Sequence, residues 1–275
     1  MNNDSPKKAL LVVFLVALFC SVLVSVASIL LKPIQQRNQL VERSKNVISL
    51  TGLVEDSAAL SNDAILEAIN LLDIRVINID SGEFASDLNA AEFDSRAVVN
   101  DPELSISIPA ELDVASLSRR SRYEIIYLVW DGNTLSRVIL PIVGTGMWST
   151  IRGYIALQND LNTIAAVSFY EQTETAGLGD QIERPDWQAQ WQGRKLFDSQ
   201  GRFRFRVGPG TIAPNSPASS YQVDSLSGAT VTSDAVTRIV AYWFGANGYK
   251  RFLDQLDAQP AVKAAAADAT GGSTS

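Results

Sequence analysis

Residues 123–143 read YEIIYLVWDGNTLSRVILPIV, and this stretch decides the fold class. Its two halves, Tyr123–Trp130 and Leu135–Val143, are rich in β-branched and aromatic residues, which favour extended strands. The turn residues DGN, at positions 131–133, lie between the two halves. Two strand-like runs separated by such a turn predict an antiparallel β-hairpin.

The flanking sequence extends this hairpin into an α+β domain. Further strands are predicted at residues 73–79, 153–158, 163–170, 203–207 and 221–224. Helices are predicted from Asn62 or Asp63, from Pro185 through Trp191, and from Thr232 to Asn247 as the last substantial helix. Thr232, Ser233 and Asp234 are the candidate N-caps of that last helix. Residues 84–121 predict only a connecting region, so we expect a mainly antiparallel sheet with flanking helices.

Residues 9–31 read ALLVVFLVALFCSVLVSVASILL and contain no charged side chain. As a helix they would span roughly 34 Å, enough to cross the hydrocarbon layer of a membrane. A signal peptide cleaved near Ser25-Val26-Ala27 is the alternative, but the apolar run is longer than the usual signal-peptide core. We therefore predict one retained transmembrane helix, in which Cys20 is a small apolar filler.

Composition excludes several classes of chemistry. The 275 residues include no histidine and one cysteine, and the formal net charge is −7. These counts exclude a Ser-His-Asp or Cys-His nucleophile, histidine-ligated metals, a cysteine-ligated iron–sulfur cluster and an intramolecular disulfide. The acidic balance also argues against a general nucleic-acid binder. We expect no catalytic side chain and no metal site, so redox chemistry would need a borrowed cofactor.

Three stretches are richer in glycine and hydroxyl groups than packing requires. They are LPIVGTGMW at 140–148, ETAGLG at 174–179 and DSLSGATVTS at 224–233. Glycine lets the backbone approach a ligand closely, and a helix start attracts phosphate. Each stretch also has an ordinary interpretation, as a strand exit, a turn and a helix cap respectively.

The third stretch, with Ser-Gly-Ala-Thr at its centre, resembles the flavinylation motif of the FMN-binding domain family. In that family a transferase moves FMN from FAD onto the threonine hydroxyl as a phosphoester. The three stretches in this order, after the apolar anchor, resemble the C subunits of the Na⁺-translocating NADH:quinone reductase (Nqr) family over most of the chain. The region containing LLDIRVINID at 71–80 resembles the Nqr C subunits rather than the related, shorter G subunits of Rnf complexes. An Rnf-type G subunit is the nearer alternative. A membrane-anchored binding domain without redox chemistry is the more distant alternative.

The resemblance implies a set of cofactor-binding residues. Thr230 would carry covalent FMN, and Ser227, Gly228 and Ala229 would form the recognition turn. The loop beside the flavin ring would contain Glu174, Thr175, Gly177, Leu178 and Gly179, and the other wall would contain Gly144, Gly146 and Trp148. The chain departs from the family at Gln172, where histidine is common, and at Ala176, where proline is common. The alanine makes the loop less rigid.

The resemblance also implies a place for the chain in a membrane complex. Electrons from NADH, oxidised on another subunit, would pass through the FMN towards quinone, coupled to Na⁺ export. The expected partners are Nqr subunits A, B, D, E and F and an FAD:protein FMN transferase. The family places the soluble domain on the periplasmic side of the bacterial inner membrane. Lys7 and Lys8 before the apolar run and four basic residues after it suggest the opposite orientation, but that rule is weak for long domains.

These expectations divide the chain into five parts. They are a cytoplasmic N-terminus at 1–8, a transmembrane anchor at 9–31, a stalk and N-terminal α/β part at 32–121, an FMN-binding domain at 122–258, and a disordered tail at 259–275.

Overall fold

A computed structural model of the chain describes residues 6–54, 59–208 and 216–258. The chain divides into two compact units, Met1–Ser44 and Lys45–Ser275. The predicted tail at 259–275 and the first five residues of the predicted cytoplasmic N-terminus lie outside the described residues.

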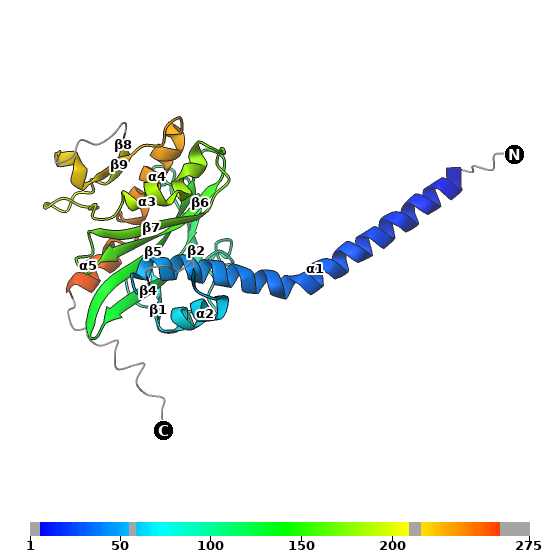
Figure 1. Cartoon of the computed structure of the whole chain (residues 1–275), viewed down its shortest axis with the longest axis horizontal. Helices are drawn as coiled ribbons and strands as arrows, with labels where there is room; N and C mark the ends of the chain where they lie inside the picture. Colours follow the sequence, from blue (N-terminus) through cyan, green and yellow to red (C-terminus); the bar gives the residue numbers. More distant parts are fainter. Residues whose placement is uncertain (1–5, 55–58, 209–215, 259–275) are drawn as a thin grey trace, which may run out of the picture. The chain divides into compact units, whose positions relative to one another are not determined.

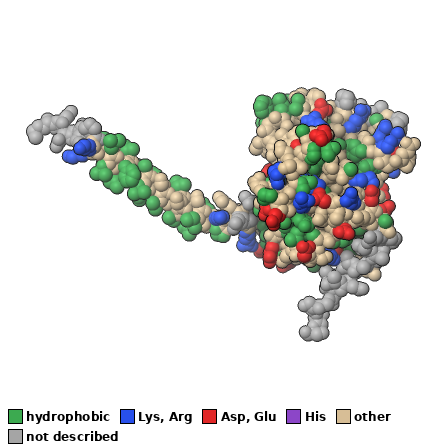
Figure 2. Space-filling model, turned by 180° about the vertical axis from the view of Figure 1, so that it is seen from behind, with side chains coloured by type: hydrophobic (Ala, Val, Ile, Leu, Met, Phe, Trp, Pro, Cys, Tyr) green, Lys and Arg blue, Asp and Glu red, His purple; other side chains and the backbone are tan. Residues whose placement is uncertain are grey.

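Helix α1 spans Pro6–Thr51 and carries the predicted membrane segment. Its large apolar side chains from Leu10 to Leu31 are exposed to more than two-fifths of their area. Figure 2 shows these hydrophobic side chains along the helix, with basic side chains near its ends. Among the described residues, this is the one helix long and apolar enough to cross a membrane. Apolar side chains on all sides of a helix that lacks a protein core around it suit a lipid environment.

The second unit is built on a five-stranded antiparallel sheet with strand order β1-β4-β5-β6-β7 (Figure 1). The strands are β1 (Asp73–Asn78), β4 (Tyr123–Asp131), β5 (Thr134–Thr145), β6 (Thr150–Gln158) and β7 (Ile164–Glu171). Asp131 pairs with Thr134 at the DGN turn, and β6 pairs with β7 across Asn159-Asp160. Both predicted hairpins and the predicted strand at 73–79 are therefore confirmed.

Helices cover both faces of this sheet because its strands are apolar on both sides. The end of α1, through Val47 and Ile48, packs with α2 (Asn62–Asn70) and Ile139 on one face. On the other face, Val138 and Leu140 pack with three helices. These helices are α3 (Pro185–Ala189), α4 (Thr230–Trp243) and α5 (Lys250–Ala258). Neighbouring residues of β5 thus belong to opposite cores, as the alternation of side chains along a strand requires.

Helix α4 is fixed against the C-terminal half of β5. A side chain on Gly144 would lie 2.3 Å from the Ile239 side chain, so the helix and the strand approach each other closely at this glycine. Trp243 Nε1 donates to the Val143 carbonyl at 2.6 Å, and the Tyr249 hydroxyl donates to the Pro141 carbonyl at 2.6 Å. These contacts set the helix axis and place its first residue, Thr230, near the glycine-rich loop that follows β5.

The remaining elements are short and differ most from the sequence predictions. Strands β2 (Ser105–Ser107) and β3 (Arg119–Ser121) form an antiparallel pair within the region predicted only as a connection. Strands β8 (Arg206–Gly208) and β9 (Gln222–Asp224) pair in parallel as a separate two-stranded sheet. Two 3₁₀ helices that lie fully within the described residues are η2 (Gly179–Glu183) and η3 (Pro217–Ser220).

Several predicted helix boundaries are wrong. Helix α2 is capped by Ser61, whose hydroxyl accepts the Ala64 N–H, rather than by Asn62 or Asp63. Helix α4 begins at Thr230 and ends at Trp243, where the prediction ran from Thr232 to Asn247. It is not the last helix, because α5 follows it. Helix ends depend on hydrogen bonds that a periodicity of apolar residues does not specify.

Candidate functional site: the start of helix α4

Thr230 is the first residue of α4 and is exposed. The turn before it contains Gly228, whose φ of +74° is costly for any residue with a side chain. The N-cap residue, Ala229, makes no capping hydrogen bond with its side chain. The N–H groups of the first helical turn therefore lack a capping partner at the place where the Thr230 hydroxyl is accessible.

The predicted N-caps have other roles. Thr232 and Ser233 are buried inside the first turn of the helix. The Ser233 hydroxyl accepts the Leu226 N–H and donates to the Ala229 carbonyl, both at 3.0 Å. The Thr232 hydroxyl donates to the Glu174 carboxylate at 2.7 Å. Asp234, the third candidate, is exposed and also lies beyond the N-cap position. The prediction that these residues cap the helix is wrong, because the helix starts before them.

The Glu174 carboxylate joins three segments that are distant in sequence. Oε2 accepts the Met147 N–H at 3.0 Å in addition to the Thr232 hydroxyl. Oε1 accepts the Trp148 N–H at 3.0 Å, the Ser149 N–H at 3.1 Å and the Ser149 hydroxyl at 3.0 Å. The glycine-rich loop after β5, the loop after β7 and the start of α4 are thus held together by one side chain that is 7% exposed.

These donors keep Glu174 ionised. Burial alone would raise the pKa of its carboxyl group. Hydrogen bonds from the Trp148 and Met147 N–H groups and from the Thr232 and Ser149 hydroxyls outweigh burial and hold the pKa below its ordinary value. The negative charge also lies beside the positive end of the α4 dipole, which favours it.

The loops around this carboxylate expose apolar side chains. Trp148 is 69% exposed, and Met147, Leu178 and Val231 are also exposed. A side chain on Gly228 would meet Leu178 Cδ2 at 2.9 Å, so Leu178 lies directly against the turn before Thr230. An apolar group of this kind at the mouth of a glycine-rich turn suits a flat aromatic ligand.

The other predicted site residues fall into three groups. Gly146 and Gly179 pack against Glu174, where added side chains would lie 2.6 Å and 2.8 Å from its atoms. Gly144 faces Ile239 of α4, so its contact in this structure is with the core. Ser227, Thr175 and Gly177 are exposed, as is Ala176, the position where the family often has proline.

Gln172, at the position where the family often has histidine, supports the Glu174 loop. Its Oε1 accepts the Glu174 N–H at 2.5 Å. This bond orders the backbone that presents the Glu174 carboxylate. The glutamine therefore has a visible structural role, as an acceptor two residues before the carboxylate that it helps to position.

Three further residues complete this arrangement: Met147 and Ser149, which were not predicted as site residues, and Thr232, which was predicted only as a helix cap. Met147 and Ser149 lie inside or beside a stretch that had been singled out, but their contribution is largely through backbone N–H groups. Every residue except proline has a backbone N–H group, so the residue types at 147 and 149 could not show that these N–H groups bind Glu174.

Comparisons with known proteins agree with this geometry. Residues 146–245 match the FMN-binding domain family. The chain is 38% identical to the C subunit (NqrC) of the Na⁺-translocating NADH-quinone reductase of Pseudomonas aeruginosa, over 93% of this chain and 97% of that protein. The protein of the same name from Neisseria meningitidis serogroup B is also 38% identical, over 93% and 96% of the two chains.

Solved structures similar to the chain include two of this name. The crystal structure of Shewanella oneidensis NqrC has a TM-score of 0.73 and 32% identity, covering 82% of this chain and 99% of that one. The crystal structure of the protein of that name from Parabacteroides distasonis, with a TM-score of 0.60 and 23% identity, supports the fold alone. The chain therefore belongs to the NqrC family, whose members are subunits of the Na⁺-translocating NADH-quinone reductase, an oxidoreductase complex.

Proposed function

We propose, with membership of this family as the premise, that the chain carries FMN joined through a phosphoester to the Thr230 hydroxyl. The observation that supports this most directly is the exposed Thr230 on the first turn of a helix without a side-chain cap. A phosphoester at this point would retain a negative charge, which the free N–H groups and the dipole of α4 stabilise.

The surrounding residues fit the rest of an FMN molecule. Gly228 leaves the turn free of a side chain, and Leu178 lies against it. Leu178 and Val231 supply exposed apolar area next to this turn, and Trp148 is exposed on the loop held by Glu174; such area suits the flavin ring. Ser227 and Thr175 are exposed hydroxyl residues on the flanking loops and can donate to polar atoms of the cofactor.

The protein's part in the chemistry is to hold and orient the cofactor. FMN, when bound, supplies one-electron transfer that no side chain of this chain can perform. Glu174 fixes the two loops and the helix start relative to one another through its five hydrogen bonds. The ester bond prevents loss of the cofactor, and the exposed position of Trp148 leaves the site accessible to an electron-transfer partner.

The proposal extends to the complex. Electrons derived from NADH would pass through this FMN towards quinone, with Na⁺ export coupled to the complete reaction. The partners would be Nqr subunits A, B, D, E and F, and an FAD:protein FMN transferase would attach the cofactor. Residues 9–31 would anchor the chain in the bacterial inner membrane, with residues 1–8 in the cytoplasm and the FMN domain in the periplasm.

Replacing the attachment residue tests the proposal. The full chain and Thr230→Val are each coexpressed with a flavin transferase, and flavin fluorescence and mass are measured after denaturation. The wild type should retain one FMN and Thr230→Val none, because valine has no hydroxyl to esterify. Thr134→Val, at an exposed position in the β4–β5 hairpin, is the matched control and should retain FMN. Flavin retained by Thr230→Val would refute the assignment.

A pair of glycine variants tests the fit of the turn. Gly228 and Gly201 both have positive φ, at +74° and +72°, so alanine should cost each about 1 kcal/mol of folding stability. The added methyl group would meet a neighbour, Leu178, at Gly228, whereas nothing lies within 4 Å at Gly201, which is outside the proposed site. We expect Gly228→Ala to lower the fraction of flavinylated chains and Gly201→Ala to leave it unchanged. Equal flavin content in the two variants would contradict a role for the Gly228 turn.

A further inference from the structure

A second polar site lies in a cavity of about 180 Å³ lined by the end of β5, the start of β6, β3 with the loop before it, the start of β4 and the segment 95–99. The charged residues among those that line it are four arginines and one carboxylate: Arg96, Arg119, Arg120, Arg152 and Glu124. Guanidinium groups repel one another when they converge, so such a cluster requires compensation by anions. The cavity's own lining supplies only one carboxylate.

The arginines are held in place by partners around the cavity. Arg120 pairs with Asp80 at 2.7 Å, and Arg96 pairs with Glu171 at 3.0 Å. Arg119 is held by neutral oxygens, with its terminal nitrogens donating to Ser105 Oγ at 2.7 Å and Ser107 Oγ at 2.6 Å. The side chains are therefore arranged before any ligand arrives, which reduces the entropy cost of binding.

Two of these arginines keep buried donors without an acceptor. Arg120 is 5% exposed, and its Nε forms no hydrogen bond, although the Tyr242 hydroxyl interacts with the same guanidinium group. Arg152 Nε lies 3.3 Å from Glu171 Oε1 as an ion pair but forms no hydrogen bond, and it too is buried. Buried charged donors are costly when unsatisfied, so an acceptor at this place would be favoured.

We infer that this arginine cavity binds a small oxyanion of the phosphate class. Arginine suits phosphate because its N–H groups match the oxygens in pairs. The volume is below the ~300 Å³ at which pockets for drug-sized molecules begin, so the site would take a free phosphate or a single phosphate group rather than a whole nucleotide. The hydroxyls of Ser116 and Thr150 also line the cavity and add possible donors.

The cavity adjoins the first site through the backbone. The Thr145 N–H donates to the Ala115 carbonyl at 2.9 Å, and its hydroxyl donates to the Ser116 carbonyl at 2.6 Å. Thr145 thus joins the rim of the cavity to the loop that carries Trp148. None of the cavity-lining residues is among those proposed to hold FMN. Anion binding in the cavity can therefore be tested independently of FMN attachment.

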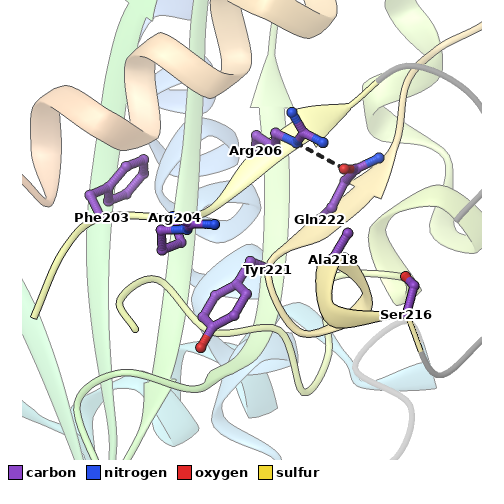
Figure 3. A pocket seen from close by; sticks show the side chains of 7 residues that line it. All are labelled: Phe203, Arg204, Arg206, Ser216, Ala218, Tyr221 and Gln222. Atoms are coloured by element: carbon purple, nitrogen blue, oxygen red, sulfur yellow. Dashed lines mark hydrogen bonds between the residues drawn. The ribbon is translucent and has the colours of Figure 1, made fainter. Parts of the chain in front are cut away.

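Another arginine-lined hollow provides an internal control. Arg204 and Arg206 line a wider opening of about 580 Å³ with Tyr221 and Gln222 (Figure 3). Arg206 Nε already donates to Gln222 Oε1 at 2.8 Å, and both arginines are exposed. The described residues of this hollow contain no buried, unpartnered donor. This wider hollow is also lined by arginines, but it lacks the buried, unsatisfied donors of the arginine cavity. We therefore expect no specific anion binding in the hollow.

Titration calorimetry of the purified full chain in detergent tests the inference, with inorganic phosphate as the probe in a chloride buffer. We expect one phosphate per chain. Arg152→Gln should weaken binding about tenfold or more, since it removes a charge-assisted donor. In a buffer about one pH unit above the Glu124 pKa of about 7, where this carboxylate is ionised, Glu124→Gln should strengthen binding several-fold, because it removes the one negative charge from the lining. That gain cannot result from misfolding. Arg204→Gln, the matched control, should bind as the wild type does.

The same measurements on Thr230→Val separate this site from the proposed FMN attachment, and phosphate should bind that variant normally. Vesicles with and without phosphatidic acid distinguish a lipid headgroup from free phosphate as the source. Binding to phosphatidic acid that Arg152→Gln weakens and Arg204→Gln does not would also support the site. The absence of binding to either probe, or equal losses in Arg152→Gln and Arg204→Gln, would overturn the inference.

Discussion

Glu174 and Glu124 are buried to nearly the same extent, with exposed fractions of 7% and 9%, yet their pKa values shift in opposite directions. Glu174 receives five hydrogen bonds and its pKa is lowered. Burial raises the pKa of Glu124 to about 7, because Ser95 and one backbone N–H offset it only in part. The balance between burial, which raises the pKa of both carboxyl groups, and the number of donors aimed at each one decides whether the carboxylate holds a fixed charge.

The difference suggests two roles. A carboxylate that stays ionised can tie three segments of chain into one site, as Glu174 does at the start of α4. A carboxylate whose pKa is near neutrality can change its charge under ordinary conditions, as Glu124 would in the arginine cavity. The two regions lie at neighbouring ends of β5 and β6 and can be compared by matched variants.

Removing the charge at Glu174 should have the largest effect. Glu174→Gln keeps the shape of the side chain but directs an amide NH₂ at N–H and hydroxyl donors. We expect the free energy of unfolding to fall by about 3 kcal/mol, from the loss of charged hydrogen bonds and the unsatisfied donors left behind. Chemical denaturation of the full chain, followed by tryptophan fluorescence, measures this.

The exposed Glu67→Gln on α2 is the control for that variant and should change stability by less than about 0.5 kcal/mol. A Glu174→Gln protein as stable as the wild type would show that the five hydrogen bonds do not hold the segments together.

Glu124 should produce the opposite response to pH. Its folded-state pKa of about 7 exceeds its ordinary value of 4.5, so the folded state holds a proton that the unfolded chain has released between these values. Stability should therefore decrease as pH rises from about 4.5 to about 7, by up to about 3 kcal/mol from this group. Glu174, with a lowered pKa, contributes stability that is lost only as pH falls below about 4.5.

Glu124→Gln checks this sign. Glutamine stays neutral, so the variant should lose the decrease between pH 4.5 and 7 and be more stable than the wild type above pH 7. Denaturation curves across this range, with the exposed Glu111→Gln as control, measure the slope. An unchanged slope in Glu124→Gln would place the titration elsewhere.

Two serine variants should give the smallest effects and test the donor count directly. Ser149→Ala removes a hydroxyl donor from Glu174, and Ser95→Ala removes one from Glu124. Each should cost about 1 kcal/mol at pH values where its carboxylate is ionised. Ser95→Ala should move the midpoint of the pH dependence above 7, while Ser149→Ala should shift the Glu174 pKa less, because four donors remain. Carboxyl chemical shifts of the two glutamates, measured by NMR, distinguish these outcomes.

The strongest sequence patterns predicted the fold correctly. The hairpins within 123–143 and 153–170 and the strand at 73–79 follow from β-branched and aromatic runs bounded by turn residues. The weaker region at 84–121 contains β2 and β3, which are three residues each and lack a periodic pattern. Short strands are stabilised by their partners rather than by their own composition, so the sequence did not reveal them.

The assignment of FMN-binding residues stays a prediction, but the structure shows where these residues lie. The three stretches rich in glycine and hydroxyl groups come together, and the helix after the third begins at Thr230, two residues before its predicted start. The predicted cap residues were wrong because the helix begins before them. The Thr232 hydroxyl bonds to Glu174, and the Ser233 hydroxyl bonds to the turn before α4. The arginine cavity was not foreseen, since its arginines come from segments separated by intervening strands and loops.

The sequence by itself determined the apolar helix at the N-terminus, the antiparallel order of the central hairpins, and the family to which the chain belongs. These features depend on residue types at short, regular spacings. Only the tertiary structure decided that Glu174 joins three loops and stays ionised, while Glu124 is buried among arginines with few donors. The pKa of a buried carboxylate depends on the direction of backbone N–H groups and on neighbours far along the chain. Local sequence specifies neither of these.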